Sequence, residues 1–109
     1  MKIITDKNQA LKLIKKQPAT LLLCSDDLQN DRDFVLEAVS QDGLALKYAS
    51  PELKNNEDIV RVAVWRNGLA LEYASKELKN NLEVVRVAVE ENPAAFKFAS
   101  KETVLKLKE

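Results

Sequence analysis

Carboxylate side chains recur at intervals of 25 residues, and this ladder is the first pattern in the sequence that could carry chemistry. A column of acidic groups in a regular structure could bind a cation or a basic partner. Each of these residues, however, follows a serine by two positions, as in Ser50-Pro51-Glu52. A carboxylate placed there also lies in the first turn of a helical segment capped by the serine, where the helix dipole favours negative charge. We favour this structural role for the ladder, which consists of Asp27, Glu52, Glu77 and Glu102.

A second ladder, of asparagines, accompanies the carboxylates at Asn30, Asn55 and Asn80. In other helical-repeat proteins, regularly spaced asparagines can hold the backbone of a ligand. Here each asparagine directly precedes the expected start of a helix, where Asn and Asp side chains relieve local backbone donors. We therefore expect these residues to act in capping rather than in binding.

The chain lacks the residues on which most enzymes and metal sites depend. It contains no histidine, which removes the commonest general base and the commonest metal ligand. Its single cysteine, Cys24, stands where Ala49 and Ala74 stand 25 and 50 residues later, so we interpret it as a core residue rather than a nucleophile. Two glycines are too few for a glycine-rich phosphate loop. We expect no enzymatic activity, no cofactor and no small-molecule substrate.

Both ladders belong to an internal repeat of 25 residues that runs through the chain without gaps. The stretch "NGLALEYASKELKNN", from Asn67 to Asn81, follows "DGLALKYASPELKNN" 25 residues earlier. A fixed period of this length is typical of stacked-repeat proteins, in which each unit buries its apolar side against its neighbours. We therefore predict a single domain over residues 1–109. It comprises repeats 3–27, 28–52, 53–77 and 78–102 and a C-terminal tail, 103–109.

Each repeat opens with the pattern of an amphipathic helix. Apolar residues fall at the spacing i, i+1, i+4 and i+5, as in Ile59-Val60 and Ala63-Val64, and this spacing makes one helical face. Acidic residues occupy the first turn, where the helix dipole favours them. In each case the residue before the helix has a short side chain that can accept hydrogen bonds from the first free amides. These expected N-caps are Asp31, Asn56 and Asn81.

The second half of each repeat, such as "LALEYAS", allows two interpretations. Apolar residues alternate between Leu69 and Tyr73, which on its own is typical of a strand. Asn92-Pro93, however, resembles an N-cap followed by proline at the first helical position. Ala70 and Ala74, four residues apart, would form a small-residue stripe suited to close helix contact. We predict a helix.

Glycine and proline mark the turns between these helices. Gly43 and Gly68 follow the first helix of their repeats, and we expect each to leave it in a left-handed conformation. Pro51 inside a helix would cost about 3 kcal/mol. We therefore expect Ser50 to cap a new single turn that carries Leu53 into the core. The sequence thus predicts an all-α fold, a short solenoid-like stack of four 25-residue helix-turn-helix units.

Several recurring elements resemble a known family: Asn-Gly-Leu-Ala-Leu-x-Tyr-Ala-Ser, Glu-Leu-Lys-Asn-Asn and Val-x-x-Ala-Val. The family is domain of unknown function 4116, which consists of short tandem helical repeats of this period. The resemblance is close over residues 28–102 and weaker over 3–27, because Gln9 stands where Phe34 and Ile59 stand in later repeats. The resemblance implies a repeat architecture, and it implies no activity, cofactor or catalytic residue.

Departures from the repeat point to a candidate contact surface. Trp65 occupies the position of Ser40 and Glu90, which are residues typical of a solvent-facing position, and it lies opposite the apolar face of its helix. Tryptophan is among the residue types most enriched at binding hot spots. The alternative for the valines of this surface is that they simply touch adjacent repeats. The candidate patch consists of Arg61, Val62, Trp65, Arg66, Leu82 and Val87.

The charge balance limits the classes of partner. Seventeen basic and seventeen acidic residues cancel, so nucleic-acid binding is disfavoured. We expect an interaction module that binds an unidentified protein or itself. The alternatives are a stacking segment of a larger repeat array and, third, a nucleic-acid-binding accessory.

The sequence also favours a cytoplasmic location. One cysteine forms no internal disulfide, and no secretory signal follows Met1. The longest apolar run, from Leu21 to Cys24, is too short to span a bilayer, so we expect no membrane contact.

Overall fold

The computed structural model describes residues 3–108, and these residues are mostly helical. Within this range no strand is present, apart from an isolated parallel bridge between Ile4 and Cys24. The predicted all-α class is therefore confirmed. None of the described helices has both the length and the apolar character needed to cross a bilayer.

Each repeat contributes a ten-residue α-helix and then a six-residue 3-10 helix, with a further helical segment after them. The ten-residue helices are α1 (Lys7–Lys16), α3 (Arg32–Gln41), α5 (Glu57–Arg66) and α6 (Leu82–Glu91). The six-residue 3-10 helices are η1 (Pro18–Leu23), η2 (Gly43–Tyr48), η3 (Gly68–Tyr73) and η5 (Pro93–Phe98). The segments that follow them are α2 (Asp26–Gln29), α4 (Pro51–Lys54), η4 (Leu78–Asn80) and α7 (Lys101–Lys108).

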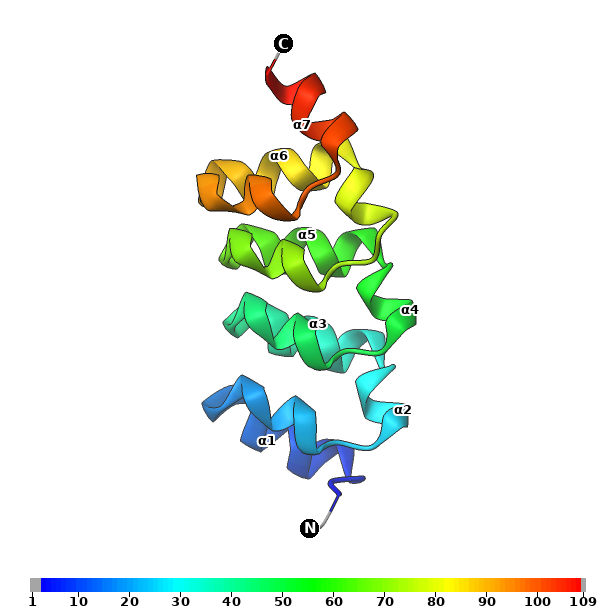
Figure 1. The fold of residues 1–109 in the computed structure, drawn as a ribbon. Helices are drawn as coiled ribbons and strands as arrows, with labels where there is room; N and C mark the ends of the chain where they lie inside the picture. Colours follow the sequence, from blue (N-terminus) through cyan, green and yellow to red (C-terminus); the bar gives the residue numbers. More distant parts are fainter. Residues whose placement is uncertain (1–2, 109) are drawn as a thin grey trace.

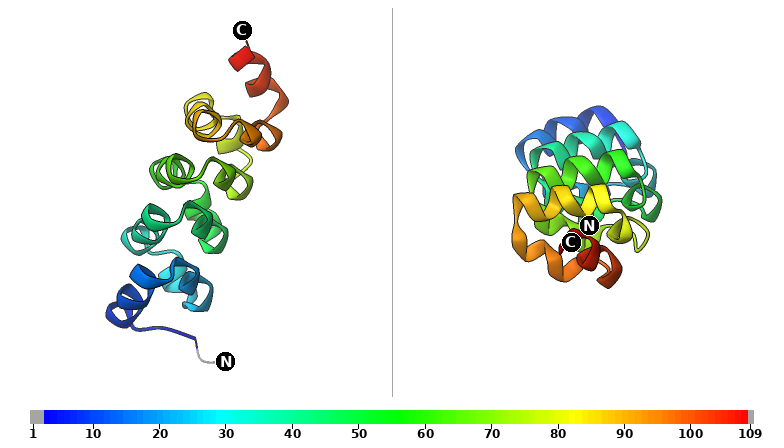
Figure 2. Two further views of the ribbon diagram at one scale, coloured as in Figure 1. Left: turned by 90° about the vertical axis from the view of Figure 1, so that its left-hand side faces the viewer. Right: turned by 90° about the horizontal axis from the view of Figure 1, so that it is seen from above.

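Equivalent segments of successive repeats lie side by side, so that the chain forms layers (Figures 1 and 2). α3 packs between α1 and α5, α5 packs against α6, and the six-residue 3-10 helices contact one another in the same order. The molecule is elongated, with extents of 48 × 22 × 22 Å, and its two ends lie at opposite ends of the stack. Each layer is therefore held mainly by the layers before and after it.

The ten-residue helices begin at the predicted caps. Asn56 Oδ1 accepts a hydrogen bond from the Ile59 amide at 3.1 Å. Asp31 and Asn81 cap α3 and α6 in the same way. Each helix then turns its apolar face inward, and α5 buries the whole predicted face. The four residues of that face, each 0% exposed, are Ile59, Val60, Ala63 and Val64.

The restart predicted after the second segment is also present. Ser50 Oγ accepts a hydrogen bond from the Leu53 amide at 3.2 Å, and Leu53 is buried. The backbone of the same serine also joins two layers, because its amide donates to the carbonyl of Gln29 at 2.9 Å. The equivalent links in the next two layers run from Ser75 to Lys54 at 2.9 Å and from Ser100 to Lys79 at 3.0 Å.

The second segment of each repeat is a 3-10 helix, so the expected small-residue stripe is wrong. Ala70 lies within η3, whereas Ala74 is the extended residue that follows it, with φ −71° and ψ 159°. Both alanines are buried, but they do not share one helical face. A 3-10 helix has three residues per turn, which places Gly68 and Leu71 in line against the neighbouring layer.

The expected left-handed glycines are also wrong, because no glycine in residues 3–108 has a positive φ. The glycines are needed for close approach between layers. A Cβ added to Gly68 would overlap the carbonyl oxygen of Ala88 and would lie 3.2 Å from the Asn92 amide nitrogen. Gly43 meets Ala63 in the same way. The backbones of adjacent layers are therefore in contact at these two positions.

An ion pair joins the first two layers. Lys7 Nζ lies 2.9 Å from Asp31 Oδ2, and the Asp31 side chain is 27% exposed. Burial alone would raise the pKa of Asp31, but hydrogen bonds from Lys7 and from the Phe34 amide outweigh it, so this pKa lies below its usual value. The hydrogen bond to Asp31 likewise raises the pKa of Lys7, against the opposing effect of burial. Both pKa shifts therefore show that the ion pair favours the charged forms of Lys7 and Asp31.

The close approach predicts that Gly68→Ala destabilises the protein. At an unstrained helical position this substitution would stabilise the chain by about 0.4–1 kcal/mol through the unfolded state. Here the added methyl group must push two backbones apart, and we expect the free energy of unfolding to fall by about 1–3 kcal/mol. Urea unfolding followed by circular dichroism measures the change. A variant as stable as the parent would disprove the close approach.

The matched control is Pro93→Ala, at the equivalent position of the last repeat. Pro93 is exposed and has no further ten-residue helix beside it among the described residues. Loss of the proline restraint alone should cost about 0.4–1 kcal/mol.

The ion pair predicts a pH-dependent effect of Asp31→Asn. Asparagine keeps the cap, as at Asn56 and Asn81, but removes the charge that Lys7 binds. The folded pKa of Asp31 lies below the unfolded value, so its charge stabilises the fold above the unfolded pKa, and this contribution is lost as the pH falls through the folded pKa. We expect the parent to be more stable than the variant at pH ~7, and the difference to vanish near pH ~2.

Urea midpoints at several pH values test this expectation. Asp33→Asn, which removes an 83% exposed carboxylate, is the control and should show little effect at any pH. A constant difference between parent and Asp31→Asn across the acidic range would show that the charge does not contribute.

Candidate functional site

Trp65 lies on the outer side of the helical stack, in the last turn of α5. Its side chain is 67% exposed, whereas the opposite face of the helix is fully buried. The equivalent residues of α3 and α6, Ser40 and Glu90, are also exposed, so this position faces outward in each of these layers. Trp65 therefore places a large apolar ring where neighbouring layers carry polar groups.

A shallow apolar depression of about 240 Å³ adjoins the tryptophan ring. Its walls are Arg61, Val62 and Trp65 from α5 and Val87 from α6. Val62 and Val87 are half-buried and pack against the core. The sequence left open whether the two valines touch adjacent repeats or form part of a contact surface. In the structure they do both, because they pack against the core and also form an outward-facing wall. We call these four residues the Trp65 surface.

Two residues of the predicted patch lie outside the depression. The Arg66 side chain donates from Nη2 to the carbonyl of Gln41, in the preceding layer, at 3.4 Å. Leu82 is 36% exposed and is the first residue of α6, whereas Trp65 lies in the last turn of α5. The structure thus brings together Arg61, Val62, Trp65 and Val87, and it does not bring Arg66 or Leu82 to the same depression.

Two exposed ion pairs lie near the Trp65 surface. Arg61 lies 3.6 Å from Glu57 on the same helix, and Arg86 lies 3.3 Å from Glu83. All four side chains are about half exposed. Exposed pairs of this kind contribute about 0–1 kcal/mol. These side chains can therefore exchange their present partners for others at small cost.

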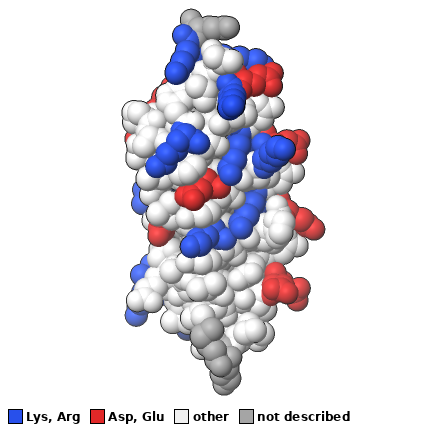
Figure 3. Space-filling view, in the orientation of Figure 1, with Lys and Arg blue, Asp and Glu red and all other residues white. Residues whose placement is uncertain are grey.

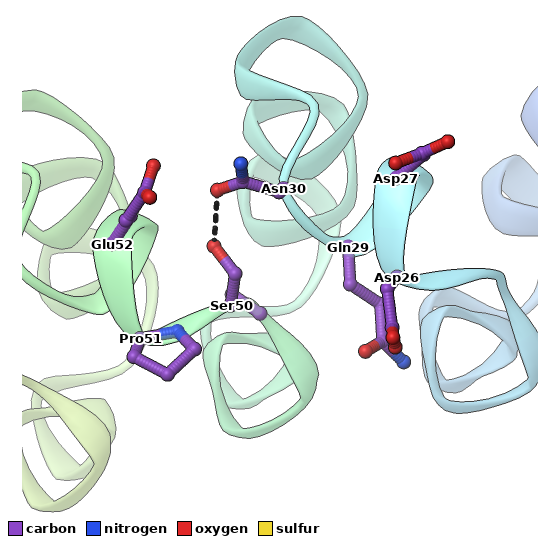
Figure 4. Close-up of a pocket in the computed structure, with 8 residues that line it drawn as sticks. Asp26, Asp27, Gln29, Asn30, Ser50, Pro51 and Glu52 are labelled. Atoms are coloured by element: carbon purple, nitrogen blue, oxygen red, sulfur yellow. Dashed lines mark hydrogen bonds between the residues drawn. The ribbon is translucent and has the colours of Figure 1, made fainter.

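The asparagine ladder joins layers instead of capping helices. Ser50 Oγ donates a hydrogen bond to Asn30 Oδ1 at 2.6 Å (Figure 4). The same bond forms between Ser75 and Asn55 at 2.5 Å and between Ser100 and Asn80 at 2.6 Å. The sequence carries a signal of this bond, since each asparagine precedes a serine by 20 residues in three successive repeats.

The carboxylate ladder lies beside these bonds, along the column of short helices. An open hollow of about 560 Å³ lies here. Figure 4 shows Asp27 and Glu52 pointing to one side of it and Asp26 and Gln29 to the other, while Asn30 points toward Ser50. Asp27, Glu52 and Glu102 occupy first turns, as predicted, whereas Glu77 directly precedes η4. In residues 3–108 no group of three His, Cys, Asp or Glu side chains is placed to hold a metal ion.

Cys24 is a packed core residue, as the repeat predicted. Its side chain is 5% exposed, and its thiol lies 3.5 Å from the carbonyl oxygen of Thr20. Burial raises the pKa of the Cys24 thiol, which disfavours the reactive thiolate.

The serine–asparagine bond predicts an energetic coupling between layers. Ser75→Ala removes both the cap on the Leu78 amide and the bond to Asn55, and should lower the free energy of unfolding by about 1–2 kcal/mol. Asn55→Ala removes the interlayer bond alone. In a double-mutant cycle the combined loss should be smaller than the sum of the two losses by about 0.5–1 kcal/mol.

Thermal and urea unfolding of the four proteins provide the measurement. Ser40→Ala is the control, because its exposed hydroxyl donates only to Glu37 of its own helix. Additive effects of Ser75→Ala and Asn55→Ala would show that the bond does not couple the layers.

Comparison with known proteins identifies the repeat. The model of a family described as a domain of unknown function (DUF4116) matches the chain over residues 6–54, 31–64 and 56–103. A search of curated proteins and a search of solved structures each found no match. The three matches overlap and together extend from residue 6 to residue 103, as expected for tandem copies. The chain therefore belongs to the DUF4116 family.

Proposed function

We propose that this protein is a protein-association module that uses the Trp65 surface. The observation that carries the proposal is the 67% exposed ring of Trp65 beside an apolar depression, at a position where α3 and α6 carry Ser40 and Glu90. Packing of this chain does not require a tryptophan there. A partner that covers the ring supplies a physical reason for its presence.

Burial of this ring would contribute substantially to binding. A tryptophan side chain buries about 150–250 Å² at an interface. At about 25 cal/mol per Å², covering the exposed two thirds of such a side chain is worth about 2.5–4 kcal/mol before the cost of association. The surface is also rigid, because α5 and α6 pack against each other and their inner faces are buried. A rigid surface loses little conformational freedom when it binds.

The proposal includes no catalysis, cofactor or small-molecule substrate. The exposed ion pairs hold ordinary surface carboxylates, and burial raises the pKa of the one thiol, that of Cys24. We place the protein in the cytoplasm, because a lone buried thiol is typical of a reducing compartment.

A second candidate function is supported by the last layer of the stack. Val89 and Phe96 are half-buried, whereas the equivalent Val64 and Leu71 are 0% exposed because the next layer covers them. A further repeat or a similar hairpin could cover α6 and η5 in the same way. This observation favours a stacking segment of a larger array as the alternative.

Nucleic-acid binding has less support than either candidate. Figure 3 shows Lys and Arg side chains gathered on one half of the face, with Asp and Glu side chains among them and along one edge. The net charge of the chain is zero. Nucleic-acid affinity depends largely on Lys and Arg side chains that neutralise backbone phosphates, and acidic side chains among them weaken it.

The proposal predicts that Trp65→Ala weakens association and leaves the fold intact. The exposed ring makes few internal contacts, so the free energy of unfolding should change by less than about 0.5 kcal/mol. The variant should capture less protein from native cell extract than the parent does. In sedimentation of the purified proteins, the variant should also associate less than the parent.

Leu22→Ala is the matched control, since Leu22 is 56% exposed but lies on η1, away from the Trp65 surface. A Trp65→Ala variant that captures the same proteins and has the same mass at every concentration as the parent would refute the proposal.

A further inference from the structure

The turn between α5 and η3 contains Asn67 and Gly68, and Asn67 is the only asparagine of the chain that a glycine follows. An asparagine in this setting can lose its side-chain amide, because glycine has no side chain to shield the backbone nitrogen that attacks. We propose that Asn67 is a deamidation site, and that contact between the layers of α5 and α6, above all through Glu91, keeps it unreactive in the folded chain. The inference goes beyond the proposed function and does not depend on it.

The reaction needs only water as a co-reactant. The amide of Gly68 loses its proton, and its nitrogen attacks Cγ of Asn67. A bond forms between these two atoms, the bond from Cγ to Nδ2 breaks, and ammonia leaves with that proton, which gives a five-membered cyclic imide. Water then opens the imide at either carbonyl. The product is aspartate, or isoaspartate, in which the backbone has one extra methylene group.

The backbone at Asn67 is far from the shape that this ring requires. Ring closure needs the Gly68 nitrogen and the Asn67 Cβ on the same side of the bond between Cα and the carbonyl carbon. The ψ angle of Asn67 is 106°, which places the two atoms on opposite sides. The side chain is also held, because Oδ1 accepts a hydrogen bond from the Leu69 amide at 3.0 Å. The peptide between Asn67 and Gly68 must therefore rotate before Asn67 can react.

Two contacts with the next layer oppose this rotation. The Gly68 amide donates a hydrogen bond to Oε1 of Glu91, the last residue of α6. Gly68 also packs so closely that an added Cβ would overlap the carbonyl oxygen of Ala88. The Glu91 carboxylate has a chemical effect as well, since a negative charge beside the amide disfavours the loss of its proton. Both contacts are lost when η3 separates from α6.

The neighbouring repeats lack this combination. In the preceding layer Asp42 stands before the glycine, and an arginine, Arg66, stands at the position of Glu91. In the last repeat Pro93 replaces the glycine, and a proline nitrogen has no proton to lose. The site is therefore confined to the contact between the layers of α5 and α6.

Modification would weaken this contact. Either product adds a carboxylate one residue away from the amide that Glu91 binds, and like charges repel. Isoaspartate also lengthens the backbone next to Gly68, where the two layers are in backbone contact. A chain that reacts during one opening therefore closes less well afterwards.

The rate of deamidation at Asn67 tests the proposal. The purified full chain is incubated in mildly alkaline buffer, with and without unfolding urea. Mass spectrometry of proteolytic peptides then measures aspartate and isoaspartate at this position over time. We expect the reaction in buffer to be at least ~10-fold slower than in urea, because only molecules with η3 detached can react. Equal rates would overturn the proposal, since the fold would then give no protection.

Glu91→Ala tests the role of the carboxylate. Loss of the hydrogen bond and the charge should raise the rate in buffer by roughly 3–10-fold and leave the rate in urea unchanged. Glu91→Gln keeps an acceptor and should give an intermediate rate, and Gln41 at the equivalent position of α3 shows that glutamine fits the fold. The control is Glu90→Ala, which removes an exposed carboxylate from the same helix and should react like the parent.

Urea midpoints of the same variants separate local from global opening. A rate for Glu91→Ala in buffer that exceeds the parent rate by more than the rise in unfolded fraction supports the proposal. An increase that only matches that rise overturns the role of Glu91, because global unfolding would account for it. A rate equal to that of the parent overturns this role as well.

Discussion

Contact between the backbones of successive layers is the constraint on which the rest of the structure depends. A Cβ at Gly43 or Gly68 would overlap a carbonyl of the next layer, and the amide of each repeated serine donates to a carbonyl of the layer before. Such contacts fix both the spacing and the register of the layers. Many side chains at the inward positions are small or branched, as Ala63 and Val64 are. Variation is left to positions that face away from both neighbours.

The Trp65 surface follows from that freedom. On α5 and α6 the outward positions carry Val62, Trp65 and Val87, whereas the same positions of α3 carry Glu37 and Ser40. The buried side of these helices is nearly unchanged between layers. The apolar recess is thus built on a packed framework without altering it, and a functional surface of this kind can change while the fold is retained.

Much of the fold could be predicted from the sequence, because the repeat shows each local rule several times. The caps at Asp31 and Asn56 and the restart at Ser50 each depend on neighbouring residues and were found as expected. The role of Gly68 could not be predicted, since it depends on the distance to another layer. The Trp65 surface could be predicted only in part, because it also depends on contact between two layers. The helical period places Trp65 outward, but only the packing of α6 on α5 shows that Val87 reaches the recess and that Leu82 does not.

Within residues 3–108, the layer of α1 is held more weakly than the middle layers. In this range α1 has a neighbouring ten-residue helix on one side only, and it carries exposed Gln9 where α3 and α5 bury Phe34 and Ile59. Detaching α1 therefore exposes less apolar surface than separating α3 from α5. Amide protons of α1 should exchange with solvent through local fraying, while those of α5 await a larger opening. Protection of amide protons against exchange therefore rises from α1 toward α5.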